Sequence, residues 1–445
     1  MAMKTGQTPR AIAHVAISRI EGDKGYTDLV LSHLLDRHSF AERERAFVTQ
    51  VVRGAIRWKK RFDWMIDHLF TGQRDQLPQN IRWLLWQALY QLEFMQVPSY
   101  AAVNECVQLA RTLHLHRWTG VINGILRAYL RKPDGITFPD AETSPIEHLA
   151  VAESHPEWLV ELMLHHFGFD MTREYCRANN QAPDLTLRLN QRKISADDFA
   201  DLLASNNVDY EASPVPGFYR IRAIDYDFRT QLMAEGMVTV QDDSAGLVGL
   251  LADPQPAQIV VDLCAAPGGK STHLAELMRD QGVVISGDVN KKRIVLLDRT
   301  ARRLDLSSVH AIVADAGHFP MQRADVVLLD APCSGLGAIR KKPDVRWKKS
   351  AREVRELADL QRRLINRASE LVKPGGVLVY STCTVLPEEN EMIIDEFVGN
   401  NRRFQIVNAH TSNIADEFIT DQGFIRTWPH KNRMDGSFAA KMIKF

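Results

Sequence analysis

Apolar residues recur at helical spacing through the first part of the chain. Between Ala11 and Leu130 they return every three or four positions, as at Val103, Val107 and Ala110, and no alternating strand pattern interrupts them. This pattern predicts an all-α domain. Its helices are expected over residues 27–35, 41–58, 80–94, 100–113 and 118–130.

The pattern changes after residue 131. Residues 132–145 collect proline, glycine and small polar side chains, which indicate a linker. Helical and strand-like stretches then mix, which predicts a small α+β domain. Its helices are expected over 157–167, 171–179 and 196–205, and its strands over 185–189 and 218–221.

From Gly236 onward, strand and helix patterns alternate regularly. Such alternation predicts an α/β domain with a mostly parallel sheet covered on both faces. We expect strands over 259–262, 283–288, 310–315, 324–330 and 376–381, helices over 272–279, 291–304, 352–372 and 388–398, and completing strands over 404–407, 424–427 and 438–444. The three expected domains cover residues 1–138, 139–236 and 237–445.

Composition narrows the class of protein. The 445 residues are 45% hydrophobic and 25% charged, as in ordinary globular proteins. No apolar run approaches the roughly 18 residues of a membrane span, and Met1 to Arg10 lacks the apolar stretch of a secretory signal. We expect a cytoplasmic protein without a membrane partner. The five cysteines show no metal-site spacing and suggest reduced thiols: Cys106, Cys176, Cys264, Cys333 and Cys383.

A net charge of zero hides an uneven distribution. Residues 1–140 hold 19 Lys and Arg against 13 Asp and Glu, whereas residues 141–236 hold 8 against 16. The first segment therefore suits a polyanion best. Two basic clusters could contact phosphates or could be solvated helix faces: Arg53, Arg57, Lys59, Lys60 and Arg61, and Arg340, Lys341, Lys342, Arg346, Lys348 and Lys349.

The stretch from Ile259 to Lys270 reads as a strand, a tight loop and the start of a helix. Gly268 and Gly269 carry no Cβ, so the backbone can come close to a ligand. Their spacing fits neither the dinucleotide fingerprint nor a Walker P-loop, and a plain turn between strand and helix is the alternative.

Acidic residues and cysteines follow the predicted strands. Four strands end in a carboxylate, and parallel strands would bring these ends to one rim of the sheet, where open α/β sheets bind ligands. Clustered acids need donors to offset their repulsion. The acids are Asp262, Asp288, Asp315 and Asp330. Cys333 and Cys383 follow neighbouring strands at the same rim, either as packed thiols or as nucleophiles. Local composition does not say which thiol would react.

Longer motifs carry a family resemblance. The loop Cys264-Ala265-Ala266-Pro267-Gly268-Gly269-Lys270 resembles the first motif of S-adenosylmethionine-dependent RNA cytosine-5 methyltransferases. Further matching motifs lie at 330–337, 342–347, 381–390 and 435–440. Residues 1–135 resemble the RNA-binding domain of NusB. Together these features resemble the ribosomal RNA small-subunit methyltransferase B family over essentially the whole chain.

The resemblance implies a cofactor site and a set of residue roles. S-adenosylmethionine would lie on a Rossmann-like sheet, with residues 264–270 under its methionine part. Asp288 would bind the ribose and Asp315 the adenine, with Asp330 beside them. Cys383 would be the nucleophile, Cys333 would act in product release, Asp330 would face the cytosine edge, and Lys270 would assist catalysis. No metal is implied.

The implied reaction is methylation of carbon 5 of one cytosine in 16S ribosomal RNA, either free or in an early assembly particle. A thiolate added to carbon 6 would make carbon 5 nucleophilic. A transfer-RNA cytosine-5 methyltransferase and a non-catalytic RNA-binding assembly or antitermination factor are the alternatives. The sequence leaves the oligomeric state open, and a monomer is our working expectation.

Overall fold

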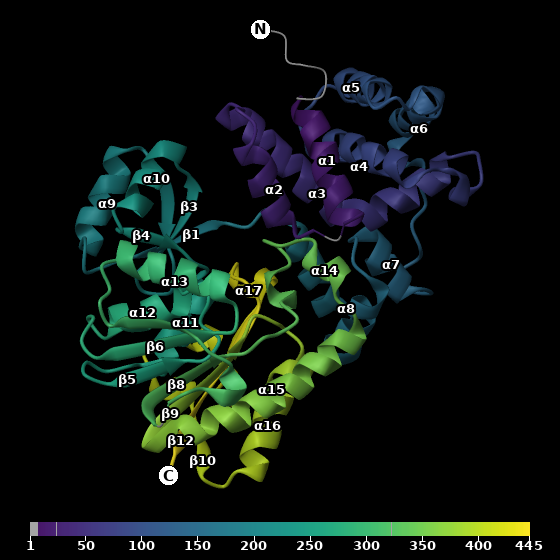
Figure 1. Cartoon of the computed structure of the whole chain (residues 1–445). Helices are drawn as coiled ribbons and strands as arrows, with labels where there is room; N and C mark the ends of the chain where they lie inside the picture. The colour runs from purple at the N-terminus through teal and green to yellow at the C-terminus, as the bar shows by residue number, and fades with distance from the viewer. Residues whose placement is uncertain (1–7, 24, 322) are drawn as a thin grey trace. The chain divides into compact units, whose positions relative to one another are not determined.

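The computed structural model describes residues 8–23, 25–321 and 323–445. The interpretation of the N-terminus as lacking a secretory signal thus rests largely on residues outside this set. Contacts divide the chain into two units, each made of two chain segments (Figure 1). The helical unit comprises Met1–Gln181 and Ile339–Ser350, and the sheet unit comprises Ala182–Ala338 and Ala351–Phe445.

The first unit is all helical, as predicted. The helices are α1 (Pro9–Glu21), α2 (Thr27–Asp36), α3 (Glu42–Leu69), α4 (Gln79–Phe94), α5 (Ser99–Thr112), α6 (Thr119–Arg131), α7 (Pro145–Ala152) and α8 (Glu157–Asn180). Helix α3 runs well past its expected end at residue 58 because Phe62, Met65 and Ile66 continue its buried face. Helix α8 contains the expected interruption, since Gly168 has φ 72°.

The segment Ile339–Ser350 completes the helical unit. It contains the short helix α14 (Val345–Lys348), and Trp347 packs against the helical core. Arg346 is fully buried and donates to the carbonyl oxygens of Ser154, at 2.9 Å, and Asn179, at 3.1 Å. The segment lies between the two chain segments of the sheet unit in sequence, but it packs with the N-terminal helices.

The sheet unit begins with a small antiparallel sheet in the order β2-β3-β1-β4. Its strands are β1 (Leu185–Leu189), β2 (Asp209–Ala212), β3 (Phe218–Ala223) and β4 (Val238–Val240), with α9 (Ala196–Ser205) and α10 (Tyr226–Ala234) supplying helical residues to its core. Strands β2 and β4 were not predicted. The first is an edge strand of sequence Asp-Tyr-Glu-Ala with little apolar signal, and the second has three residues.

The main sheet has the order β10-β12-β9-β8-β5-β6-β7, with β11 paired to β12. Strands β5 to β9 run parallel and β12 runs antiparallel to β9. The predicted α/β fold is confirmed. The strands are β5 (Ile259–Asp262), β6 (Val283–Asp288), β7 (Val309–Val313), β8 (Ala324–Asp330), β9 (Val372–Thr382), β10 (Phe404–Val407), β11 (Ile425–Thr427) and β12 (Ser437–Lys444).

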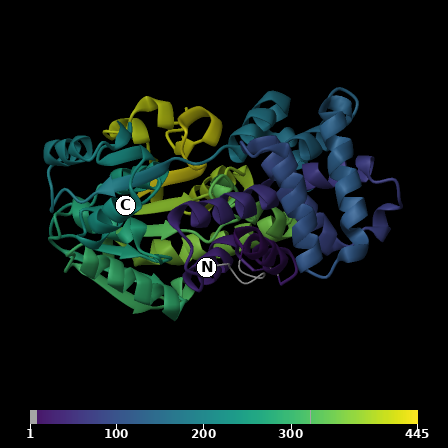
Figure 2. The same cartoon turned by 90° about the horizontal axis from the view of Figure 1, so that it is seen from above.

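Helices cover both faces of this sheet. One core joins the sheet to α15 (Ala351–Leu371) and α16 (Glu391–Asn400), and the other joins it to α11 (Asp243–Ala252) and α12 (Gly269–Leu277). Figure 2 shows strands side by side with helices on either side. Helix α13 (Lys291–Arg303) contacts β6 and β7. In the part of the chain that the structure describes, no helix is long and apolar enough to cross a membrane.

Candidate active site

The loop between β5 and α12 places backbone at the carboxyl edge of the sheet. Gly268 has φ 106°, a left-handed conformation that favours glycine. A Cβ at this position would also lie 2.8 Å from Cγ of Leu297, so glycine is required twice over. The hydroxyl of Thr272 donates to the Gly268 carbonyl at 2.8 Å and fixes the loop to the first turn of α12.

Asp262 lies beneath this loop and is fully buried. It accepts a hydrogen bond from Ser271 Oγ at 2.7 Å, and burial raises the pKa of its carboxyl to about 7. Asp262 therefore lies at the end of β5, at the expected rim of the sheet, but the loop covers it and it supports the loop from below.

Asp288 ends β6 and faces two donors from its own chain. The Asn290 amide donates to it at 2.8 Å, and the Arg293 guanidinium lies 3.4 Å from its other oxygen. Arg293 also donates to the Ala266 carbonyl. Lys291, Lys292 and Arg293 open helix α13 after this acid. All three side chains are exposed, and Arg293 also joins the loop after β5 to the carboxylate at the end of β6.

Asp315 lies two residues beyond β7, which ends at Val313 rather than at the acid. It caps the short helix η4 (Ala316–His318) by accepting from the Gly317 amide at 2.8 Å, and this hydrogen bond lowers its pKa. Val289 and Val313 are 68% and 55% exposed beside these acceptors. Carboxylate acceptors next to exposed apolar surface suit a nucleoside with hydroxyl groups and a flat base.

Lys270 and Asp330 form an ion pair at the start of α12 and the end of β8. The Lys270 ammonium lies 2.7 Å from Asp330 Oδ2, and Ser381 Oγ donates to Oδ1 at 2.8 Å. Burial is the largest single effect and lowers the pKa of Lys270. The charge of Asp330, its hydrogen bond and the neighbouring Cys383 and Asp262 together outweigh burial, so the pKa is raised.

Cys333 and Cys383 come together after β8 and β9. Their sulfurs are 3.3 Å apart, and the Cys383 amide lies 3.4 Å from the Cys333 sulfur. Both residues, and the other three cysteines, carry thiols. Cys383 is exposed and Cys333 is half-buried. The hydrogen bond with Cys383, followed by burial, raises the pKa of Cys333, so its proton is held firmly. Burial likewise raises the pKa of Cys264.

A buried pair, Glu389 and Asn390, holds the two cysteine loops. Glu389 accepts from the amide of Ser334 at 2.8 Å and from the Ser334 hydroxyl, next to Cys333. Asn390 donates to the Thr384 carbonyl at 3.0 Å, next to Cys383. The sequence interpretation quoted these residues only as part of a motif. A Glu-Asn pair six residues after a rim cysteine, behind the apolar run 385–387, was the available signal.

Two glycines allow a further close approach behind the thiols. The Gly337 amide donates to the Cys383 carbonyl at 2.9 Å, and the Gly436 amide donates to the Gly337 carbonyl at 2.9 Å. A Cβ at Gly337 would lie 1.7 Å from the Gly436 oxygen. The motif at 435–440 therefore reaches the cysteine loops through backbone contacts.

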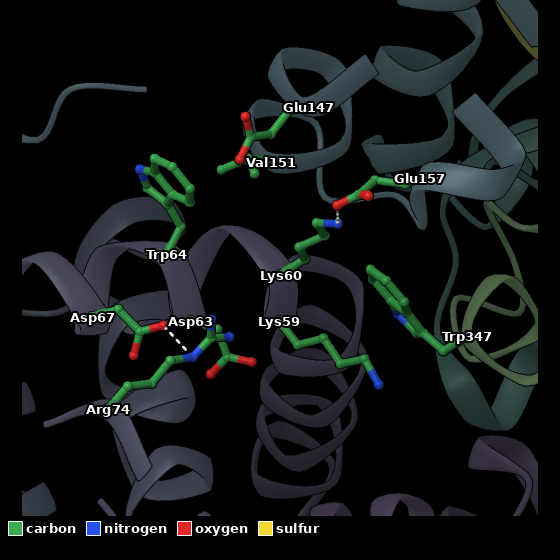
Figure 3. A pocket seen from close by; sticks show the side chains of 10 residues that line it. All are labelled: Lys59, Lys60, Asp63, Trp64, Asp67, Arg74, Glu147, Val151, Glu157 and Trp347. Carbon is green, nitrogen blue, oxygen red and sulfur yellow. Dashed lines mark hydrogen bonds and ion pairs between the residues drawn. The ribbon is translucent and has the colours of Figure 1, made fainter. Parts of the chain in front are cut away.

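Both basic clusters predicted from the sequence contain side chains that are buried or paired with acids. In the first cluster, Lys59 pairs with Glu21 and Lys60 with Glu157, each at 2.7 Å. Figure 3 shows the Lys60 pair at a pocket of ≈ 380 Å³ that four acidic side chains also line. In the second, Arg346 is buried and Lys348 donates to the Gly25 carbonyl and lies 2.8 Å from Asp344. The partners of these side chains all belong to the helical unit.

The parallel sheet with its antiparallel β12, together with the loop after β5, defines a methyltransferase of the S-adenosylmethionine-dependent class. Comparison with solved structures agrees. The chain superposes on the protein PH0851 with TM-score 0.79 and 26% identity over 100% of both chains. It also superposes on a methyltransferase homolog protein from Pyrococcus horikoshii with TM-score 0.60 and 25% identity, covering 68% of this chain and 100% of that one.

The chain belongs to the RsmB/F family of rRNA methyltransferases. Family models for 16S rRNA methyltransferase RsmB/F, the NusB family and the RsmF/B-like ferredoxin-like domain match residues 249–443, 7–131 and 155–217. Relatives named probable ribosomal RNA small subunit methyltransferase B are 33% identical in Bacillus subtilis, covering 98% of both chains, and 36% identical in Synechocystis, covering 98% of this chain and 99% of the relative. The predicted family is confirmed, and the domain limits at 138 and 236 stay predictions.

Proposed function

We propose that the protein transfers a methyl group from S-adenosylmethionine to carbon 5 of a cytosine in 16S ribosomal RNA, with Cys383 as the nucleophile. The observation that carries this proposal is the meeting of two thiols, 3.3 Å apart, beside the Lys270–Asp330 ion pair at the ligand-binding edge of the sheet. A protein that only binds RNA has no need for this arrangement.

The residues present fit the cofactor. Asp288 and Asp315 offer acceptors for its ribose and adenine, with the exposed Val289 and Val313 beside them. The backbone of residues 264–270 offers a close approach for its methionine part, because Gly268 cannot carry a side chain. When bound, S-adenosylmethionine supplies an electrophilic methyl group.

The two cysteines differ in ways that support their proposed roles. Cys383 is the more exposed, and its charge interacts favourably with Lys270. As a thiolate it adds to carbon 6 of the cytosine, which forms a carbon–sulfur bond and raises the electron density on carbon 5. Carbon 5 then gains the methyl group that the cofactor would supply. Cys333 acts in the release that follows, in which the carbon-5 proton passes to water, the double bond between carbons 5 and 6 re-forms, and the carbon–sulfur bond breaks to return the Cys383 thiolate. Asp330, held by Lys270, faces the edge of the ring.

The choice of substrate is supported by the family and by the names of its relatives. The test incubates the protein and tritiated cofactor with 16S rRNA, small-subunit particles and transfer RNA in parallel, followed by bisulfite sequencing. One unconverted cytosine in 16S rRNA is the expected result. Methylation of transfer RNA alone, or of no RNA, would overturn the proposed substrate or the proposed reaction.

A further inference from the structure

The outer face of α6 differs from the two basic clusters described above. Gly120, Gly124, Arg127 and Arg131 are exposed, and their spacing of four, three and four positions places them on one stripe of the helix. The opposite face is buried in the helical core through Ile122, Ile125, Leu126 and Tyr129.

This part of the helical unit is strongly cationic. From Cys106 to Pro133 the sequence has no Asp or Glu, and it has five basic side chains: Arg111, Arg117, Arg127, Arg131 and Lys132. All five are exposed. Among the described residues, none of the five forms an ion pair. Glu105, the nearest acid before this stretch, already faces Arg10 at 3.8 Å.

The two glycines have no packing role in α6. A Cβ at Gly120 or Gly124 would meet nothing within 4 Å, so an ordinary side chain would fit in the protein as it stands. Glycine is nevertheless the least favourable helix residue after proline. A surface hollow of ≈ 500 Å³, lined by Gly124, Arg127, Leu130 and Arg131, lies at this stripe. The absence of side chains leaves room for another molecule to approach the helix backbone closely.

We infer that the outer face of α6 binds the phosphodiester backbone of RNA, with Arg127 and Arg131 at phosphates and the chain passing over Gly120 and Gly124. Guanidinium groups suit phosphate oxygens because they can donate two hydrogen bonds at once. A protein partner is less favoured, because an interface needs an apolar centre and Leu130, 36% exposed, is small for that purpose. That the RNA is ribosomal rests on the proposed function.

The test measures binding of the full-length protein to a 16S rRNA transcript over a range of salt concentrations. Replacing both Arg127 and Arg131 with Gln should weaken binding about tenfold and reduce the slope of log affinity against log salt by about 1.5. The KM for RNA should rise while kcat and cofactor affinity stay unchanged. Gly124→Gln should also weaken binding without reducing thermal stability. The charge-matched control replaces the exposed Arg37 and Arg43 of the same unit with Gln.

If the double variant at Arg127 and Arg131 keeps the RNA affinity and the salt slope of the control, the inference is overturned. Polyglutamate serves as a probe for an acidic protein. If the double variant binds polyglutamate more weakly while its RNA binding is unchanged, the face belongs to an acidic protein partner instead. Loss of RNA binding in the double variant, with no methylation of any RNA by the unaltered protein, would support the surface and overturn the proposed function.

Discussion

At the residue scale, the reaction depends on ionisable side chains that the fold buries, although such groups ordinarily stay in water. Glu389 is a fully buried acid whose pKa is raised by burial, yet it accepts three hydrogen bonds, from the Ser334 amide, the Ser334 hydroxyl and Gln361. A buried acceptor of this kind fixes its donors firmly. The position of the Cys333 loop therefore depends on an acid that touches neither thiol.

Replacing Glu389 with Met should leave these buried donors without an acceptor. We expect a loss of about 3 kcal/mol in the free energy of unfolding, because each unmade buried hydrogen bond costs roughly 1–3 kcal/mol. Urea unfolding would measure it, and methylation should fall in parallel. Glu389→Gln keeps an acceptor and should retain most of both. Glu370→Met, at an exposed ion pair with Arg367, is the control. Equal stability of the two Met variants would contradict this account.

Asp262 predicts a pH dependence of stability. Burial raises its pKa to about 7, whereas an unfolded aspartate titrates near about 3.9. Between these values the folded protein holds a proton that the unfolded chain has lost, so stability falls as pH rises through this window. Between pH 4 and pH 7 this effect lowers the free energy of unfolding by up to roughly 4 kcal/mol. Asp262→Asn should abolish this decrease, which unfolding at the two pH values measures. Asp359 is exposed, so Asp359→Asn is the control. If the free energy of unfolding has the same slope against pH in both variants, the pH dependence does not come from Asp262.

At the element scale, strands with a sharp chemical ending were predictable. Strands β5, β6 and β8 match their expected bounds because β-branched runs end at Asp262, Asp288 and Asp330. Local sequence patterns failed to predict the environment of side chains whose partners lie far away in the chain. The basic segment 340–349 looks solvent-exposed in sequence, but its partners lie far away in the chain. Asp344 accepts from the Thr27 amide of α2. The Arg340 carbonyl accepts from Arg57 of α3, and Arg346 donates to the Asn179 carbonyl of α8. The roles of Glu389 and Arg293 could not be predicted for the same reason.

The hydrogen bonds of Arg346 to α8 and the residues before it are one such distant contact, and their contribution to stability can be predicted. Arg346→Met should deprive Asn180 Oδ1 and the carbonyls of Ser154 and Asn179 of a buried donor. We expect the helical unit to lose at least about 2 kcal/mol, seen as faster hydrogen exchange in the last turns of α8. Arg352→Met removes an exposed arginine and should change little. Unchanged exchange in Arg346→Met would show that the segment 339–350 is not anchored there.

At the scale of the whole molecule, chain order and structural units do not coincide. The helical unit takes its last piece from between β8 and α15, only a few residues after Cys333. Sequence patterns predicted three consecutive domains because each stretch was interpreted from its own periodicity. Periodicity carries no information about which distant segment fills a core.

This organisation predicts how fragments behave. A fragment of residues 8–181 lacks Trp347, which packs against its core, and Arg346, which donates to α8. A second fragment joins residues 8–181 to residues 339–350 by a flexible linker. The first fragment should unfold at a distinctly lower temperature than the second. Circular dichroism during heating measures both. A matched fusion carrying Arg346→Met and Trp347→Ala should give no gain. Identical melting of the first two fragments would mean that the segment contributes nothing to the unit.

The central claim is that Cys383 attacks the cytosine. The most direct measurement mixes the protein, S-adenosylmethionine and 16S rRNA containing 5-fluorocytosine, whose fluorine blocks the final proton loss, and maps the attached peptide by mass spectrometry. The adduct should sit on Cys383. It should disappear in Cys383→Ala, and Cys333→Ala should accumulate a covalent complex even with ordinary cytosine. An adduct mapped to Cys333, or none with active protein, would contradict the account.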